Sequence, residues 1–314
     1  MQRITQLKDA QLDNTIQKWV KKVKDFLLGL CLAIILTGLS YLILSPIIGV
    51  VSGALMEVQD VLNPLVFIIP QNFTMDNFRL AWIHMDYVNT LILTMSFSIG
   101  MAALHVIITS MVGYGFARFK FPGSKILFGL MIITIVIPVQ TFMVPLFLQL
   151  RFFNFFGQEI NLIGSYMSLA LLTVAGVGLR SGLYIYIFCQ FFRGLPKEIE
   201  EAALIDGASS FRTFAVVMIP NATPVIITVF LFAFVWHYND TFYTSLLIPG
   251  NRLMPVMLTA LWGNLTIFQN IRDTNIIQLA MYAGVVLAIA PVLIIYLFLQ
   301  RHFIEGIERS GIVG

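Results

Sequence analysis

The side chains in this sequence that could support catalysis are few, and they do not form a familiar catalytic pattern. Gly123-Ser124-Lys125 lacks the upstream glycine of a phosphate-binding loop, and neither H-E-x-x-H nor G-x-S-x-G occurs. Four histidines are spread along the chain without metal-ligand spacing: His84, His105, His237 and His302. We therefore expect no catalytic residue, no metal site and no cofactor bound by this chain itself.

Arg180 is the only charged residue that falls deep within a long apolar stretch. An ionisable residue at membrane depth indicates a functional polar path, although a helix break or an ion pair between helices would also explain it. Aromatic and amide side chains near the same stretches could contact a sugar, or could serve only in packing and capping. The candidate pathway residues are Arg180, Tyr184, Asn221, His237, Tyr238 and Asn239.

The apolar stretches contain no series of Asp, Glu and His side chains, which proton-driven carriers commonly have. Energy for transport would then have to reach the chain from outside, at a polar segment. Residues 193–209 are the most polar segment in the second half of the sequence.

This segment carries the start and stop signals of a short helix at about 196–207. Pro196 suits the first helical position, and Gly207 suits the left-handed residue after the last turn. The glutamates between them favour the positive end of the helix dipole. Ser209 or Ser210 can cap the next helix. A short, well-capped helix between two apolar stretches is expected to be a docking element.

The composition is that of a polytopic membrane protein. Of 314 residues, 58% are hydrophobic and 11% are charged, whereas soluble domains average about 25% charged residues. The net charge of +3 gives no indication of nucleic-acid binding. Cys31 and Cys189 lie within apolar runs, where they are expected to be small buried side chains.

The apolar pattern predicts an all-α membrane protein with six spans, because six stretches are long enough to cross a bilayer. They lie at 26–51, 89–117, 126–150, 165–192, 212–236 and 276–299. The segment 52–88 is expected to be an extracytoplasmic loop, and 89–299 the core domain. The fourth stretch contains several glycines, so we expect it to be kinked or to begin outside the membrane core.

Lysines and arginines predict the orientation. With the N-terminus inside, the inside segments hold 14 of the chain's 19 Lys and Arg residues. Those segments are 1–25, 118–125, 193–212 and 300–314. The positive-inside rule therefore predicts an N-in, C-in protein, with a cytoplasmic N-terminal segment, a cytoplasmic tail and the helix at 196–207 in the cytoplasm.

Residues 201–220 resemble the EAA motif of permease subunits in bacterial ATP-binding-cassette importers. Glu201-Ala202-Ala203 precede Gly207 by the motif's spacing, and Pro220 closes it at the expected distance. Asp206 precedes the glycine, as is common in the family. Val217 and Ile219 replace the usual Ile and Leu.

The flanking residues resemble the carbohydrate-importer branch, specifically the maltose-permease-like second subunit. Tyr114-Gly115-Phe116-Ala117-Arg118 is similar to its Tyr-x-Phe-Ala-Arg segment, and Tyr238-Asn239-Asp240 stands where Trp-Asn-Asp is frequent. The likeness covers about residues 72–314, although the usual basic Lys-Gly ending is missing.

This resemblance implies a type I importer transmembrane domain in the bacterial cell membrane. It implies four kinds of partner: a second permease subunit, two ATPase subunits that bind ATP and Mg²⁺, an extracytoplasmic sugar-binding protein, and the lipid bilayer. The segment 237–275 is a candidate contact with the binding protein. The residues implied in coupling to the ATPase are Glu201, Ala202, Ala203, Asp206, Gly207 and Pro220.

Three other functions stay open at this point. An importer of a non-sugar solute would carry the same coupling motif. An ion-coupled secondary transporter would need no ATPase partner. An intramembrane hydrolase would need a nucleophile and a base at membrane depth, and His105 has no evident partner in the sequence.

Overall fold

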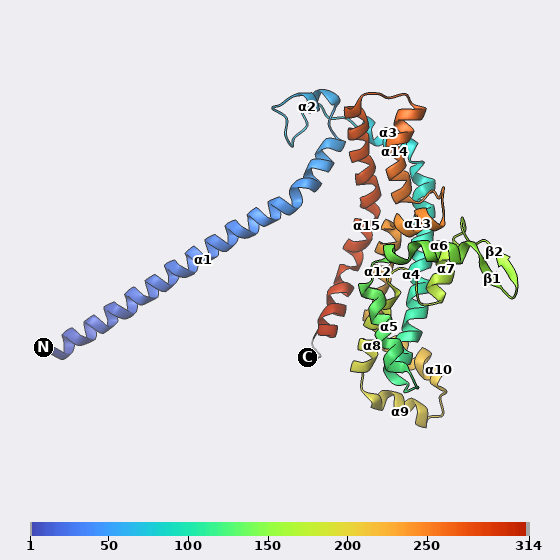
Figure 1. Cartoon of the computed structure of the whole chain (residues 1–314). Coiled ribbons are helices and arrows are strands. Elements are labelled where there is room, and N and C mark those ends of the chain that lie inside the picture. Colours follow the sequence, from blue (N-terminus) through green and yellow to red (C-terminus); the bar gives the residue numbers. More distant parts are fainter. Residues whose placement is uncertain (1, 312–314) are drawn as a thin grey trace. The chain divides into compact units, whose positions relative to one another are not determined.

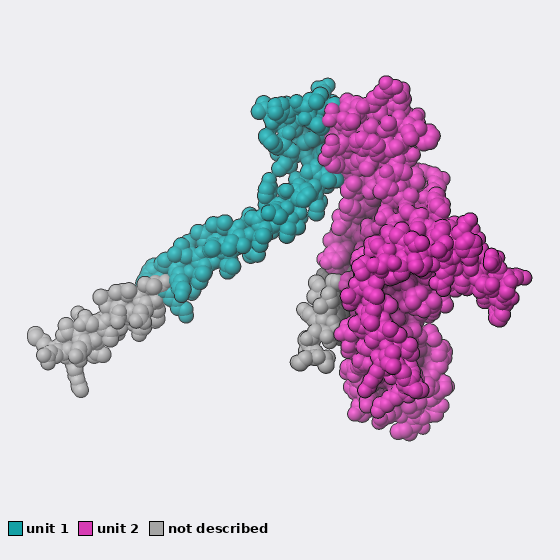
Figure 2. Space-filling model, in the orientation of Figure 1, with its two compact units in different colours: residues 1–75 teal, residues 76–314 magenta. Residues whose placement is uncertain are grey.

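The computed structural model describes residues 2–311, and the chain divides into two compact units, 1–75 and 76–314 (Figure 2). In the first unit, helix α1 (Gln2–Ala54) is continuous across the expected boundary between the polar segment 1–25 and the first span. The apolar stretch suited to a membrane begins at Lys21 and ends at Ala54. The helix continues through the expected division at residue 26 because polar residues with good helix propensity extend it, and the division between cytoplasm and membrane stays a prediction.

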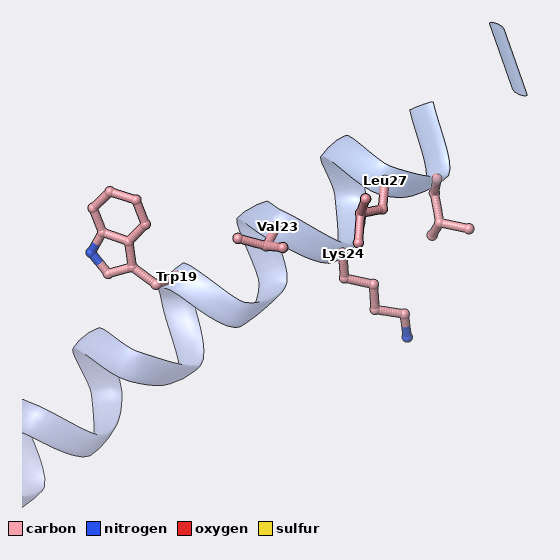
Figure 3. A pocket seen from close by; sticks show the side chains of 5 residues that line it. Trp19, Val23, Lys24 and Leu27 are labelled. Carbon is pink, nitrogen blue, oxygen red and sulfur yellow. The ribbon is translucent and has the colours of Figure 1, made fainter. Parts of the chain in front are cut away.

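The apolar side chains of α1 are largely exposed within the first unit. Figure 3 shows Trp19, Val23, Lys24 and Leu27, which together with Leu28 line a shallow apolar hollow on this helix. A long helix with apolar side chains on all sides matches a lipid environment better than water.

Asp60 organises the loop that follows α1. It lies in the short helix α2 (Val58–Leu62) and is only 1% exposed. Its carboxylate accepts hydrogen bonds from the amide nitrogens of Gln71 and Asn72, at 3.0 and 2.9 Å, and from Asn72 Nδ2 at 2.8 Å. These bonds close the segment 60–72 into a compact loop within the predicted region 52–88.

Helix α4 (Tyr87–Arg118) is the central element of the second unit. It packs mainly against α8 (Ser181–Gly194) and α12 (Thr223–Asn239). At Gly113 the backbones approach so closely that a Cβ atom would lie 2.6 Å from the Cβ of Phe188. Glycine at this position thus allows α4 and α8 to pack backbone to backbone.

A second group of helices packs around α15 (Thr274–Gly311). Helix α15 contacts α3 (Asp76–His84), α12 and α14 (Met254–Phe268). The expected tail at 300–314 forms the last part of α15, which ends at Gly311. Residues 312–314 lie outside the described residues.

Pro291 lies inside α15 and cannot donate the hydrogen bond that the carbonyl of Leu287 would receive in a regular helix. The hydroxyl of Tyr87 donates to this Leu287 carbonyl at 3.1 Å, and the hydroxyl of Tyr238 donates to the next carbonyl, Ala288, at 2.8 Å. Two tyrosines from α4 and α12 therefore satisfy the backbone where the proline weakens α15.

Three of the six expected spans are broken. In the described residues, three helices are long and apolar enough to cross a membrane, or five if each of two bent helix pairs counts as one span. The stretch expected at 126–150 forms α5 (Ser124–Val136), then η1 (Val139–Phe142) and α6 (Met143–Arg151), with a bend of 105°. Pro138 stands in the bend, where it cannot continue the preceding helix.

The stretch expected at 165–192 is divided into α7 (Met167–Val174) and α8 by residues 175–180, where Gly176 and Arg180 both have positive φ. This confirms the expected kink.

The stretch expected at 212–236 is bent by 81° between residues 210–221 and α12. Its first part consists of α10 (Ser210–Thr213), a π-helical turn, η2 (Phe214–Met218), and α11 (Ile219–Asn221). Pro220 and Pro224 lie on either side of this bend, and each lacks a backbone donor.

The protein is not purely helical. Strands β1 (Phe153–Phe155) and β2 (Gln158–Ile160) form an antiparallel hairpin, with Phe155 paired to Gln158. The two turn residues, Phe156 and Gly157, both have positive φ, as a type I′ turn requires. The expected all-α fold is therefore wrong at this hairpin, where the short turn and alternating aromatics favour strand pairing.

The ends of the second unit are distinct in Figure 1. Helices α9 (Lys197–Ile205) and α10 lie at one end, and α3 lies at the opposite end with α14. Between α12 and α14, the short helix α13 (Phe242–Leu247) packs with α7 around Leu169, Leu172 and Leu247.

Candidate coupling site and central cavity

Helix α9 is the short polar helix that the sequence predicts. It begins at Lys197, with Pro196 as the residue before the first turn, so the expected placement of Pro196 inside the helix is wrong by one position. Glu198 and Glu200 occupy the first turn, where the helix dipole favours carboxylates.

The end of α9 is closed by a Schellman motif. Gly207 has φ of +82°, its amide donates to the carbonyl of Leu204 at 3.1 Å, and the amide of Ala208 donates to that of Ala203 at 3.0 Å. The Ser209 hydroxyl then accepts from the amide of Arg212 and caps α10. The expected left-handed glycine and serine cap are confirmed, and together they fix the direction of the chain between α9 and α10.

One side of α9 faces the helical bundle, and the other side is open. Ile199, Glu200 and Ala203 are half-buried, whereas Glu201, Ala202 and Asp206 are exposed. Apolar side chains also lie on the open side of this end of the unit, since Ile205 is 85% and Phe211 67% exposed. Of the two small residues, Ala203 packs within this chain and Ala202 is available to a partner.

Glu200, which the sequence did not single out, attaches α9 to the central helix. Its Oε2 lies 3.1 Å from Nε of Arg118, and these side chains are only 14% and 6% exposed. The Tyr114 hydroxyl donates to the other carboxylate oxygen of Glu200, and Arg118 Nη2 donates to the Leu195 carbonyl at 2.8 Å. We call Tyr114, Arg118 and Glu200 the α4–α9 latch.

The latch lies in aromatic surroundings. Tyr114 packs against Phe119, Phe192 and Phe214, with ring centroids 5.1 to 5.6 Å apart. These rings come from the end of α4, from α8 and from the π-helical turn. Because water is largely excluded, the ionic contact is stronger than a surface salt bridge would be.

Pro220 does not lie on α9. It is exposed in α11, at the bend that leads to α12. The motif residues therefore occupy two places: five on the capped helix and its end, and one at the bend that joins this end of the unit to α12.

A cavity of about 710 Å³ lies further along the bundle. It is lined by the breaks between α5 and η1, between α7 and α8, and between α12 and α13. Arg180 and Asn239 are part of its lining, together with Gln140, Trp236 and Asp240. The guanidinium carbon of Arg180 is 4.3 Å from the centroid of the Trp236 ring.

The other predicted pathway residues do not line this cavity. Tyr184 and His237 are buried in the bundle, and Tyr238 is buried with its hydroxyl on the Ala288 carbonyl. Asn221 is exposed near the α11 bend, where its Nδ2 donates to the Val217 carbonyl. Of the six predicted residues, the structure brings together Arg180 and Asn239.

Two of the scattered histidines are neighbours in the fold. His105 of α4 and His237 of α12 have ring centroids 5.0 Å apart, and both are at most 2% exposed. Neither ring nitrogen of His237 has a hydrogen-bond partner. No group of three or more His, Cys, Asp or Glu side chains suited to a metal occurs within the described part of the chain.

His105 also lies near hydroxyl groups. Its Nδ1 is 3.4 Å from Ser181 Oγ and its Nε2 is 3.4 Å from Thr173 Oγ1. The expectation that His105 lacks a partner is therefore wrong. Both contacts are longer than ordinary hydrogen bonds with a hydroxyl, and His105 and Thr173 are completely buried. The arrangement is a packed polar cluster between helices.

Apolar helices, breaks within the bundle and a capped polar helix at one end together define a membrane permease. Residues 106–309 match the family model described as "Binding-protein-dependent transport system inner membrane component", and the chain belongs to this family. The family consists of transport components embedded in the membrane. The matched region includes the cavity, the latch and the whole of α9.

Curated relatives cover most of the chain. The diacetylchitobiose uptake system permease protein NgcG of Streptomyces coelicolor is 27% identical over 281 residues, covering 86% of this chain and 84% of the relative. The maltodextrin transport system permease protein MdxG of Bacillus subtilis is 28% identical over 285 residues, covering 91% and 96%.

A solved structure supports the fold. One chain in the crystal structure of a bacterial ABC transporter involved in the import of the acidic polysaccharide alginate has a TM-score of 0.68 to this protein. The match covers 89% of this chain and 98% of the other, at 21% sequence identity. The helical arrangement is thus that of an ABC importer permease.

Proposed function

We propose that this chain is one of two permease subunits in an ATP-driven importer of sugars or oligosaccharides. The relatives named above are permeases for diacetylchitobiose and maltodextrin, and the solved neighbour belongs to a polysaccharide importer. The second permease would supply the other half of the pathway, and an extracytoplasmic binding protein would deliver the sugar. ATP and Mg²⁺ would bind to the ATPase subunits and not to this chain.

The proposed arrangement has six membrane passes, with both termini in the cytoplasm. The distribution of Lys and Arg supports it, and so does the location of α9 at one end of the second unit (Figure 1). Under this arrangement the divided stretch α7–α8 forms one pass, and each of the two bent pairs forms another. Helix α9 is then cytoplasmic.

The observation that carries the function is the open face of α9. Glu201, Ala202 and Asp206 are exposed on a helix whose ends are both fixed, and Ile205 adds an apolar contact. Small and apolar side chains allow close docking in a groove of an ATPase subunit, while Glu201 can pair with a basic residue there. Movement of the ATPase would reach α4 through the latch and α12 through the bend at Pro220.

Co-purification and ATP hydrolysis test this function. The chain, tagged at its N-terminus, is purified gently from its native membrane, and its partners are identified. We expect a second permease and an ATPase whose hydrolysis rises with a binding protein plus sugar. An importer of another solute would show the same partners without sugar stimulation. A subunit that emerges alone, without ATPase activity, would contradict the proposal and direct attention to ion-driven uptake.

A single substitution in α9 tests its role in coupling to the ATPase. Glu201→Lys reverses the charge of an exposed side chain, so the fold is expected to persist while docking weakens. Uptake should fall, and sugar binding by the external protein should be unchanged. Glu159→Lys, on the exposed hairpin, is the matched control. Normal uptake by the Glu201 variant would disprove the role of α9.

A further inference from the structure

Three breaks in the helical bundle meet at the cavity. Ile137-Pro138, Gly176–Arg180 and Asn239–Thr241 all contribute to its lining. Backbone groups in such breaks lack regular helical partners, and irregular backbone at membrane depth is tolerated only where it faces protein or a water-filled space. The irregular backbone at these breaks therefore faces a space within the bundle that a solute could enter.

Arg180 is the only basic residue in this lining, and it is exposed. Its guanidinium lies over Trp236, and it forms no ion pair or hydrogen bond with another residue in the described parts of the chain. A cation–π contact restrains the guanidinium but leaves its N–H groups without acceptors. An exposed guanidinium with free N–H groups in a cavity lining is able to bind an anion.

Asp240 is the only acidic residue in the lining, and it is already engaged. It is 8% exposed, and its oxygens accept the amides of Tyr243 at 3.2 Å and Thr244 at 2.8 Å. Asp240 thus caps α13, and the charge of Arg180 is left for another group.

The backbone at Arg180 indicates that the side chain is retained at a conformational cost. Its φ is +60° with ψ of 15°, a left-handed conformation that favours glycine or asparagine. Glycine would adopt the same conformation at the break between α7 and α8 without strain. An arginine held in such a conformation points to a role for the guanidinium itself.

We propose that the cavity binds anionic oligosaccharides, and that Arg180 holds a carboxylate of a uronic acid unit. The guanidinium is the side chain best matched to a planar carboxylate, since it can donate two parallel hydrogen bonds. Gln140 and Asn239, both exposed in the same lining, can bind the sugar hydroxyls. This inference rests on the proposed sugar import and specifies its substrate class.

Substrate uptake by the reconstituted complex tests the inference. The complete importer and its binding protein are placed in proteoliposomes, with a tetrasaccharide of galacturonic acid and a neutral tetrasaccharide of glucose as probes. Arg180→Gly removes the guanidinium while relieving the strained backbone, so the complex is expected to fold and assemble, which is checked by co-purification of its subunits. Arg180→Lys keeps the charge, and Phe156→Gly relieves a similar φ of 50° in the distant hairpin.

We expect uptake of the acidic tetrasaccharide by wild type to fall about tenfold or more in Arg180→Gly, the loss that a missing charged hydrogen-bond partner causes. Arg180→Lys should retain part of the acidic uptake, and Phe156→Gly should match wild type. Uptake of the neutral tetrasaccharide should be either the same as wild type in every variant or absent from all of them.

Each other result counts against the inference. If wild type imports only the neutral sugar, or if Arg180→Gly still imports the acidic one, the cavity does not select for carboxylates. An equal loss for both sugars, with reduced assembly, would show that Arg180 pairs with the second permease subunit. If neither sugar stimulates ATP hydrolysis by an assembled complex, the proposed sugar import itself fails.

Discussion

Nε of Arg118, the last residue of α4, lies 3.1 Å from Oε2 of Glu200 in α9. This contact joins the central helix of the second unit to the helix proposed to dock the ATPase. Tyr114, one turn before Arg118, binds the other carboxylate oxygen. Because the carboxylate is held from two directions, α9 cannot shift without moving the end of α4 or breaking the latch.

Breaking the latch should uncouple ATP hydrolysis from uptake. Glu200→Gln leaves Arg118 largely buried without a counter-charge, and removal of one partner from a buried pair typically costs about 3–5 kcal/mol. Since the latch lies at one end of the unit, we expect local loosening of α9 and a several-fold fall in uptake per ATP hydrolysed. Proteoliposome uptake and phosphate release are measured together.

The reversed pair provides the control for charge. Glu200→Arg combined with Arg118→Glu should recover part of the lost coupling, whereas each single reversal should be worse than Glu200→Gln. Glu159→Gln, which removes an exposed carboxylate from the hairpin, should behave as wild type. Equal coupling in all of these variants would show that the latch plays no part in transmission.

Gly207→Ala tests the backbone at the end of α9. A Cβ atom there would meet nothing within 4 Å, so the penalty comes only from φ of +82° and should be about 1–2 kcal/mol. Gly194→Ala is a matched control, because that glycine also has free space and lies in a helix. We expect lower ATPase stimulation for the first variant only. If both variants show the same ATPase stimulation, the Schellman motif plays no part in coupling.

Gly113→Ala tests the packing of α4 against α8. The added methyl group would lie 2.6 Å from Phe188 Cβ and 3.0 Å from the amide nitrogen of Cys189, so the helices must separate. Overpacking of this kind costs about 1–3 kcal/mol. Gly115→Ala, two residues on, has open space and should be neutral or stabilising. Thermal unfolding in detergent compares the two, and similar midpoints would refute the close approach.

The proline in α15 makes a double-mutant cycle possible. Tyr87→Phe removes the hydrogen bond to the Leu287 carbonyl and should cost about 1 kcal/mol. In a Pro291→Ala background the new alanine supplies a backbone N–H for that carbonyl, so the same change should cost less. The free energies of unfolding of wild type, the two single variants and the double variant give the interaction energy between Tyr87 and Pro291. Strict additivity would mean that the tyrosine does not compensate for the proline.

The motif on α9 was predictable because its signals are local. Glu198, Gly207 and Ser209 act on backbone groups within a few residues, and the structure places the helix start and end within about one turn of the prediction. Apolar stretches likewise predicted the helical membrane class, since length and composition alone decide whether a segment suits a bilayer.

The tertiary structure alone decided which residues meet. Tyr114 and Glu200 are 86 residues apart, and His105 finds His237 only because α4 and α12 pack together. The bend near Pro138, the break before Arg180 and the end of α12 bring parts of three expected spans into the lining of one cavity. A sequence specifies caps through neighbouring residues, but contacts across the bundle depend on how whole helices pack, and no local signal contains that information.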